Sequence, residues 1–138
     1  MKPHGVLETC VYATDLQAAE RFYSEVLCLE VLAREPGRHV FFRCGHGVFL
    51  VFNPDHTEST DGDVAAHGAR GAVHVAFAVS ETELPGWREQ LATHAVAIEM
   101  EVAWPRGGHS IYFRDPAANC IELATPRLWG LAEESARF

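Results

Sequence analysis

Apolar, strand-forming residues gather in two runs of the chain, residues 6–15 and 72–81, and each run ends at polar residues that can cap a helix. Behind each run, apolar residues recur at intervals of three and four, which predicts a helix with one apolar face. These positions are Leu16, Ala19, Tyr23, Val26 and Leu27 in the first segment, and Leu84, Trp87, Leu91 and Ala95 in the second.

Three further strand-like stretches follow each predicted helix. They cover about residues 29–34, 38–43 and 47–53 in the first half, and about residues 96–103, 109–114 and 119–125 in the second. The halves also end alike, because Leu50 and Glu122 each stand four residues before a proline. We therefore predict an α+β fold built from two tandem βαβββ modules.

The two modules span residues 5–54 and 71–126 within a single domain that covers residues 1–138. Residues 55–70 are rich in Asp, Gly, Thr and His, which predicts a polar linker that is able to cover a ligand. Residues 127–138 form a C-terminal tail in this interpretation.

Composition narrows the class of protein. The 138 residues are 48% apolar and 22% charged, a balance typical of a globular domain. The net charge of -8, with only 11 Lys and Arg, disfavours nucleic acid as a partner, since phosphate binding needs clustered cations. No apolar stretch approaches the roughly 20 residues that cross a bilayer, and the N-terminus lacks the pattern of a signal peptide. We therefore expect a cytoplasmic protein with no membrane partner, in which the scattered cysteines are free thiols.

Three polar residues interrupt apolar strands at matching positions of the two modules: Glu8, His74 and Glu122. Each alone has an ordinary interpretation, as a hydrogen-bonded core histidine or as a carboxylate in an ion pair. A carboxylate in an apolar strand is nevertheless costly to desolvate unless a cation or hydrogen-bond donors compensate it. If the modules pair about a pseudo-twofold axis, the three side chains converge into a divalent-metal site with open positions. The donor set favours Fe(II) or Mn(II), with Zn(II) and Ni(II) as alternatives.

Side-chain alternation adds candidate substrate contacts. If Tyr112 faces the metal, Ser110 and Arg114 share its side of the strand, and the matching strand of the first module offers His39 and Phe41. The alternative for Arg114 is a structural ion pair. The remaining candidate substrate contacts are Tyr12, Leu50, Trp104 and Arg106.

His109 is a candidate catalytic residue, because it borders the predicted site and an imidazole titrates near neutrality. It suits a general acid or base, and the alternative is a surface histidine. Trp104, Arg106 and His109 flank Gly107-Gly108, which predicts a turn in a loop that is able to close over a ligand.

Two motifs resemble those of the vicinal oxygen chelate superfamily, which includes glyoxalase I, extradiol dioxygenases, fosfomycin resistance enzymes and bleomycin-binding proteins. The first runs from Asp15 to Leu29 and contains Phe22-Tyr23, and the second runs from Tyr112 to Glu122. The resemblance extends over about residues 7–126 and implies cupped mixed sheets.

In glyoxalase I of this superfamily, metal ligands occupy strand positions that correspond to Glu8, Leu50, His74 and Glu122. Leu50 has no donor atom, so we do not expect an authentic glyoxalase I. The other positions correspond to those of the extradiol dioxygenases and fosfomycin enzymes, which usually have His in place of Glu8. A tyrosine of the fosfomycin enzymes resembles Tyr112, which is therefore the second catalytic candidate.

The resemblance implies a divalent-metal-dependent enzyme acting on a small oxygen-chelating substrate, with lyase, isomerase or dioxygenase chemistry. The alternative is a metal-free protein that sequesters a drug or metabolite, as bleomycin-binding proteins do. The resemblance also implies a homodimer whose sites are shared between subunits, and the alternative is a monomer whose modules pair within the chain.

Overall fold

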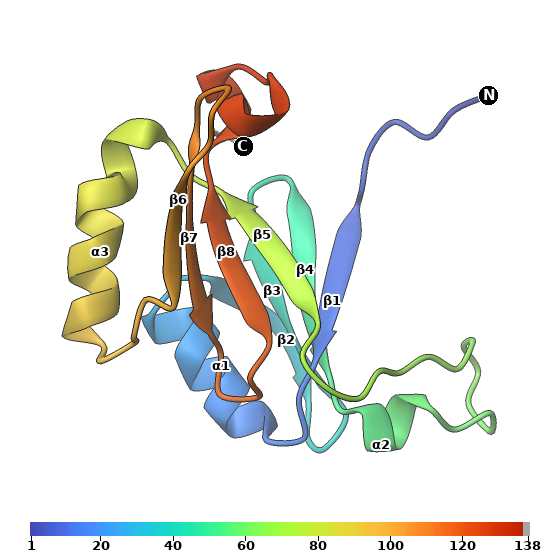
Figure 1. Ribbon diagram of the computed structural model, residues 1–138. Coiled ribbons are helices and arrows are strands. Elements are labelled where there is room, and N and C mark those ends of the chain that lie inside the picture. Colours follow the sequence, from blue (N-terminus) through green and yellow to red (C-terminus); the bar gives the residue numbers. More distant parts are fainter. Residues whose placement is uncertain (137–138) are drawn as a thin grey trace. The chain divides into compact units, whose positions relative to one another are not determined.

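The computed structural model describes residues 1–136, and the chain divides into two compact units, Met1–Val73 and His74–Phe138. Each unit contains one four-stranded mixed sheet and the helix that connects its first strand to the rest (Figure 1). The α+β class and the two tandem βαβββ modules predicted from the sequence are confirmed.

The sheet of the first unit has the order β1 (Glu8–Tyr12), β4 (Gly47–Phe52), β3 (His39–Cys44), β2 (Glu30–Glu35). Strand β1 pairs with β4 in parallel, and the other neighbours are antiparallel. Helix α1 (Leu16–Glu25) begins where the sequence predicts, because the side chain of Asp15 accepts the Ala18 backbone N–H at 2.9 Å.

The core of the first unit lies between α1 and one face of this sheet. Tyr23 is fully buried, and its ring centroid lies 4.7 Å from that of Phe49 and 5.7 Å from that of Phe42. Truncating a ring of this kind typically costs about 3–5 kcal/mol of stability. Since side chains alternate along a strand, fixing Phe42 and Phe49 toward the helix turns Phe41 and Leu50 to the other face.

The second unit repeats this arrangement with the order β5 (His74–Ala78), β8 (Cys120–Ala124), β7 (His109–Arg114), β6 (Met100–Ala103). Helix α3 (Leu84–Thr93) buries Leu84 and Leu91. A short 3-10 turn, η1 (Glu81–Glu83), precedes the helix, and the backbone N–H of Ser80 donates to Glu83 Oε2 at 2.8 Å. This contact is one half of a capping box formed by Ser80 and Glu83, and Pro85 lies within the first turn of α3.

The turn between β7 and β8 sets the register of the second sheet. Asp115 Oδ1 accepts the backbone N–H groups of Ala117 at 3.0 Å and Asn119 at 2.8 Å, and its Oδ2 accepts the Asn119 side-chain amide at 2.9 Å. Ala118 takes a left-handed conformation, with φ of 66°. These contacts hold the hairpin in the register that pairs Tyr112 with Glu122.

The polar linker is held together by ion pairs of its own. It contains a short helix, α2 (Pro54–Thr57), and Arg70 forms ion pairs of 2.8 Å with both Asp55 and Glu58. Two 3-10 turns, η2 (Pro126–Trp129) and η3 (Glu133–Ala136), follow β8. Within residues 1–136, every helix is too short or too polar to cross a lipid bilayer.

Candidate functional site

Two of the three predicted metal ligands meet on neighbouring strands of the second sheet. His74 begins β5 and Glu122 lies in the middle of β8, and the distance from His74 Nε2 to Glu122 Oε2 is 3.2 Å. The carboxylate is nearly buried, with 9% of its side chain exposed, whereas the imidazole is 51% exposed. The sheet therefore holds the acid firmly and presents the imidazole at its surface.

A backbone contact fixes the tautomer of His74. Its Nδ1 lies 3.0 Å from the Cys120 carbonyl oxygen, and a carbonyl only accepts, so Nδ1 carries the proton. In the neutral ring, the lone pair of Nε2 then faces the Glu122 carboxylate, and two acceptors face each other without a donor. A proton on Nε2 makes this contact an ordinary ion pair, and a metal ion between the two atoms would also make it favourable.

Tyr112 supports the carboxylate from the next strand. The Tyr112 hydroxyl donates to Glu122 Oε1 at 2.9 Å, and the two residues are paired across β7 and β8. Burial raises the pKa of Tyr112, the hydrogen bond to Glu122 raises it further, and a hydrogen bond with Ser110 acts in the opposite direction. The phenol therefore stays protonated near neutral pH and acts as a donor to Glu122.

Two other candidates of the second unit, Ser110 and Arg114, share the face of β7 that carries Tyr112. Ser110 shares the Tyr112 face and accepts the Trp104 indole N–H at 2.8 Å. Arg114 also belongs to this face, but its guanidinium donates to both oxygens of Glu99, at 2.6 and 2.8 Å. Arg106 is exposed in the β6–β7 turn. Ser110 is thus the candidate that the structure brings to Tyr112.

His109 lies on the opposite face of β7 from Tyr112, as alternation along the strand requires. Its Nδ1 lies against the carboxylate of Glu81, which belongs to the turn that precedes α3. The structure therefore does not bring His109 to the pair of His74 and Glu122. The alternation of side chains along β7 thus separates His109 from Tyr112, the other catalytic candidate.

In the first unit, Glu8 and Leu50 hold the positions that correspond to His74 and Glu122. Glu8 begins β1 as His74 begins β5, and Leu50 pairs with the third residue of β1 as Glu122 pairs with the third residue of β5. Glu8 is exposed and Leu50 is buried. The correspondence predicted from the repeated sequence therefore holds in the strand register.

Aromatic rings cover the Leu50 face of the first sheet. His39 stacks on Phe41 with centroids 3.9 Å apart and planes 10° apart, and Phe41 meets Phe52 edge-on at 5.2 Å. Tyr12 lies farther along this face and forms a 2.9 Å hydrogen bond with Nδ1 of His67. The structure thus brings together the predicted substrate contacts Tyr12, His39 and Phe41 on the face that also carries Leu50.

Burial keeps the Tyr12 phenol and the His39 imidazole of this face neutral. Burial raises the pKa of Tyr12 to about 12, and the nearby Cys10 adds to the shift. Burial also lowers the pKa of His39, and the charge of Arg38 lowers it further against the opposing effect of Glu35. Phenol and imidazole are therefore uncharged near pH 7, and the face suits an uncharged planar group better than an ion.

Sequence reasoning missed His67 and Phe52 at this location. His67 lies in the polar linker, yet its ring centroid is 4.6 Å from that of Phe52, and its backbone N–H donates to the Thr57 carbonyl at 2.9 Å. The sequence contains a signal for Phe52, because it lies two positions after Leu50 and therefore on the same face of the strand. No local pattern marked His67, because its partner Tyr12 is 55 residues away.

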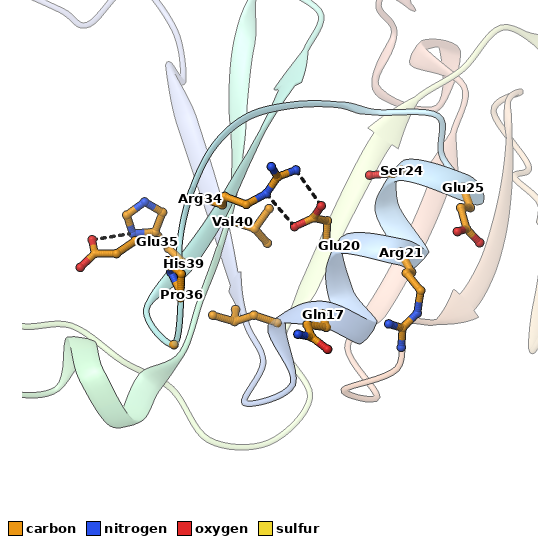
Figure 2. A pocket seen from close by; sticks show the side chains of 12 residues that line it. Gln17, Glu20, Arg21, Ser24, Glu25, Arg34, Glu35, Pro36, His39 and Val40 are labelled. Atoms are coloured by element: carbon orange, nitrogen blue, oxygen red, sulfur yellow. Dashed lines mark hydrogen bonds and ion pairs between the residues drawn. The ribbon is translucent and has the colours of Figure 1, made fainter.

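A groove of about 610 Å³ lies elsewhere in the first unit, between α1 and the β2–β3 hairpin (Figure 2). Arg34 donates to both oxygens of Glu20 at 2.8 and 3.1 Å, and Glu35 lies 3.7 Å from His39 at the other end. Among the predicted site residues, only His39 lines it. Since these charges already satisfy one another, we assign the groove no ligand.

The described residues contain no group of three His, Cys, Asp or Glu side chains close enough to hold a metal ion. His74 and Glu122 nevertheless fit two neighbouring ligands of one ion. Ligands that each lie about 2.0–2.2 Å from an ion in tetrahedral or octahedral geometry are about 3 Å apart, and their donor atoms are separated by 3.2 Å. The second unit thus offers two of the three predicted ligands in a usable geometry.

Comparison with known proteins identifies the fold family. Residues 5–123 match the family model of the Glyoxalase/Bleomycin resistance protein/Dioxygenase superfamily. The crystal structure of lactoylglutathione lyase from Agrobacterium tumefaciens is similar, with 37% sequence identity, a TM-score of 0.91, and coverage of 95% of this chain and 100% of that chain. No protein with a curated description matches the sequence significantly.

Two more distant structures share the fold. A glyoxalase/bleomycin resistance protein/dioxygenase from Nocardioides is 22% identical, with a TM-score of 0.72 and coverage of 91% of this chain and 85% of that chain. Fosfomycin resistance protein FosX from Mesorhizobium loti is 21% identical, with a TM-score of 0.63 and coverage of 90% and 93%. Because the family match covers most of the sequence, and the lyase structure is similar over nearly all of it, the chain belongs to the Glyoxalase/Bleomycin resistance protein/Dioxygenase superfamily.

Proposed function

We propose that this protein is a divalent-metal-dependent enzyme that acts on a small molecule presenting two neighbouring oxygen atoms. The observation that carries the proposal is the contact of 3.2 Å between His74 Nε2 and Glu122 Oε2, in which the backbone of Cys120 fixes the histidine tautomer and leaves two acceptors face to face. In this proposal, Glu8 of a first module supplies the third ligand.

The donor set favours Fe(II) or Mn(II), with Zn(II) and Ni(II) as alternatives. When bound, such an ion acts as a Lewis acid toward substrate oxygens, and two carboxylates leave it with little net charge for attracting an anionic substrate. Tyr112 keeps the Glu122 carboxylate in place through its hydroxyl. The neutral aromatic face of the first sheet, with Tyr12, His39 and Phe41, contacts the organic part of the substrate.

Because the similar structure is a lactoylglutathione lyase, lactoylglutathione is the first substrate to assay. Leu50 argues for a different substrate, because it occupies the register position of Glu122 and supplies no donor atom. We therefore expect at most weak activity on lactoylglutathione. Turnover at a rate typical of enzymes, about 1–1000 per second, would contradict this part of the proposal.

Metal binding tests the central part. The chelator-treated protein is dialysed against Mn(II), Fe(II), Zn(II) or Ni(II) and its metal content is measured by elemental analysis, with unfolding temperature as a parallel readout. We expect binding to depend on Glu122: Glu122→Gln abolishes it, whereas Glu89→Gln, at an exposed position of α3, does not. Wild-type protein that retains none of these metals would refute the enzyme proposal.

We further propose a homodimer in which Glu8 of one subunit joins His74 and Glu122 of the other. Glu8→Ala and His74→Ala chains, each unable to bind metal as a homodimer, are unfolded together and refolded as mixed dimers. Each heterodimer then contains one site with an intact Glu8 and an intact His74. Recovery of about half of the wild-type metal content per heterodimer supports shared sites. Heterodimers without any metal would contradict them.

The aromatic face of the first sheet supports a second candidate function, the metal-free sequestration of a planar ligand. Stacked His39 and Phe41, with Phe52 beside them, offer apolar area that needs no ion. In this case a ligand found by thermal-shift screening stabilises Glu122→Gln as much as it stabilises the wild-type protein. If stabilisation requires both Glu122 and metal, the enzyme proposal is favoured.

A further inference from the structure

One side chain of the polar linker, His67, packs on the aromatic face of the first sheet. Its ring centroid lies 4.6 Å from that of Phe52 on β4, with the ring planes at 76°, and 5.9 Å from that of Tyr12 on β1. Its Nδ1 is 2.9 Å from the Tyr12 hydroxyl oxygen. Among the groups of residues 1–136, none hydrogen-bonds to its other ring nitrogen, Nε2. An unused hydrogen-bonding atom thus stands beside the rings of this face.

The groups around Tyr12 indicate which nitrogen of His67 carries the proton. The Cys10 thiol donates to the Tyr12 oxygen at 3.6 Å. Burial raises the pKa of Tyr12 to about 12, so the phenol keeps its own proton near neutral pH. A phenol is a good donor and an unprotonated imidazole nitrogen is a good acceptor, so Tyr12 donates to Nδ1. The proton of the neutral imidazole is then on Nε2, which makes Nε2 a donor.

Strand order gives the direction in which this donor points. Tyr12, Phe52 and His39 form one row across β1, β4 and β3. The His67 ring is closer to Phe52 than to Tyr12, and its Nδ1 points back to the Tyr12 hydroxyl, so its Nε2 points away from β1. In that direction lie Phe52 and then His39, which stacks on Phe41. The Nε2–H therefore borders the rings on which a planar group would stack.

We propose that His67 is a specificity-determining residue whose Nε2–H selects planar ligands with a hydrogen-bond acceptor in the plane of the ring, such as a ring nitrogen or a carbonyl oxygen. The inference rests on the proposed use of the aromatic face as the contact surface for the organic part of the substrate, and it names the chemical class of that part. Stacked rings alone accept any flat group, whereas a donor at their edge disfavours a ligand that places an N–H there.

Quinoline and indole test the inference, because both are flat two-ring molecules that are uncharged near neutral pH. The nitrogen of quinoline is only an acceptor, and the N–H of indole is only a donor. Each is titrated into the chelator-treated protein, and binding is followed through the NMR signals of the Phe41 and Phe52 rings. His67→Phe keeps a ring beside Phe52 and removes the donor. We expect it to lower the preference for quinoline over indole by about three- to tenfold, the value of one hydrogen bond.

The matched control is His46→Phe, which should leave this preference unaltered. His46 is exposed in the turn between β3 and β4, at the opposite end of the hairpin from the paired residues His39 and Phe52. Tyr12→Phe is a second variant, and it replaces His67→Phe if that protein does not fold. Without the Tyr12 hydroxyl the imidazole is free to take its other tautomer and accept from indole, so the preference for quinoline should fall in this variant too.

The inference is wrong if His67→Phe has the same preference as wild type, or if wild type prefers indole and loses that preference in His67→Phe. Either result leaves the aromatic face standing as a contact surface. If neither molecule perturbs the ring signals of Phe41 and Phe52, the proposed contact surface fails, and the inference fails with it. The metal site is tested separately, because a chelator is present throughout these titrations.

Discussion

Leu50 on β4 and Glu122 on β8 occupy the same place in their sheets, but their surroundings differ. Glu122 is flanked by Tyr112 across β7 and by His74 from β5, both within hydrogen-bonding or ion-pairing distance. Leu50 is paired across β3 with Phe41, and Glu8 begins the neighbouring strand. One backbone register thus carries a polar pair in one module and an apolar pair in the other.

The contrast shows what a buried carboxylate requires in this fold. Tyr112 contributes a hydroxyl where Phe41 has only carbon, and that donor compensates part of the desolvation of Glu122. The first sheet omits the acid and its donor together and covers the same face with rings. The contrast supports the proposal that a metal ion binds at the second sheet.

The largest expected effect on stability comes from placing a carboxylate in the first sheet without a hydrogen-bond donor beside it. Leu50→Glu puts a carboxylate at a position that is 6% exposed and beside Phe41, which has no donor. We expect a loss of about 3 kcal/mol or more in the free energy of unfolding at neutral pH. Urea denaturation in the presence of a chelator measures it, with the volume-conserving Leu50→Met as control.

Adding Phe41→Tyr to Leu50→Glu sharpens the comparison, because it copies the Tyr112 and Glu122 pair onto the first sheet. A hydrogen bond to a charged group is worth about 1.5–3 kcal/mol, and the double variant should recover part of the loss by that amount. Equal stability of Leu50→Glu and Leu50→Met would show that the position tolerates an acid without a donor.

A smaller effect is expected at the turns that precede β4 and β8. The first turn has Gly45 at φ of 55°, whereas the second has Ala118 at φ of 66°. Ala118→Gly removes a left-handed strain of about 1–2 kcal/mol and adds chain entropy worth about 0.5–1 kcal/mol to the unfolded state. We therefore expect the free energy of unfolding, measured by thermal denaturation, to rise by about 0.5 kcal/mol. Ala117→Gly, in the same turn but without positive φ, should destabilise the protein instead.

The smallest expected effect is on the pH dependence of stability. It concerns His39, whose counterpart on β7 is Ser110, a residue that does not titrate. Because burial lowers the folded-state pKa of His39, the unfolded chain binds more protons as pH falls through its unfolded pKa near 6.5. The stabilisation is present above that pKa and is lost on acidification below it. His39→Ser should therefore show a shallower loss of stability between about pH 7.5 and 5.5. An unchanged slope would contradict a lowered pKa.

Much of the fold was predictable because its signals are local. Asp15 caps α1 through a contact within one turn, and strand alternation correctly sorted Ser110 and Tyr112 onto one face. The correspondence of Leu50 with Glu122 also followed from sequence, since both modules end in the same order of strands. These features depend on spacing of a few residues, which a single chain displays directly.

The rest depends on contacts that spacing does not encode. His67 reaches Tyr12 from a linker without periodicity, and Trp104 reaches Ser110 across a turn. Arg114 satisfies its charge on Glu99, a partner 15 residues away that no motif indicated. His109 is different, because alternation already placed it opposite Tyr112 and the prediction did not use that information.

The most direct test of the central claim is calorimetric titration of the chelator-treated protein with Mn(II), comparing wild type with His74→Ala and His94→Ala. His94, the matched control, caps the C-terminal end of α3. We predict one ion per chain for wild type and for His94→Ala, with binding lost or weakened more than about 100-fold in His74→Ala. Equal binding by all three proteins, or no binding by wild type, would contradict the assignment of the metal ligands to the second sheet.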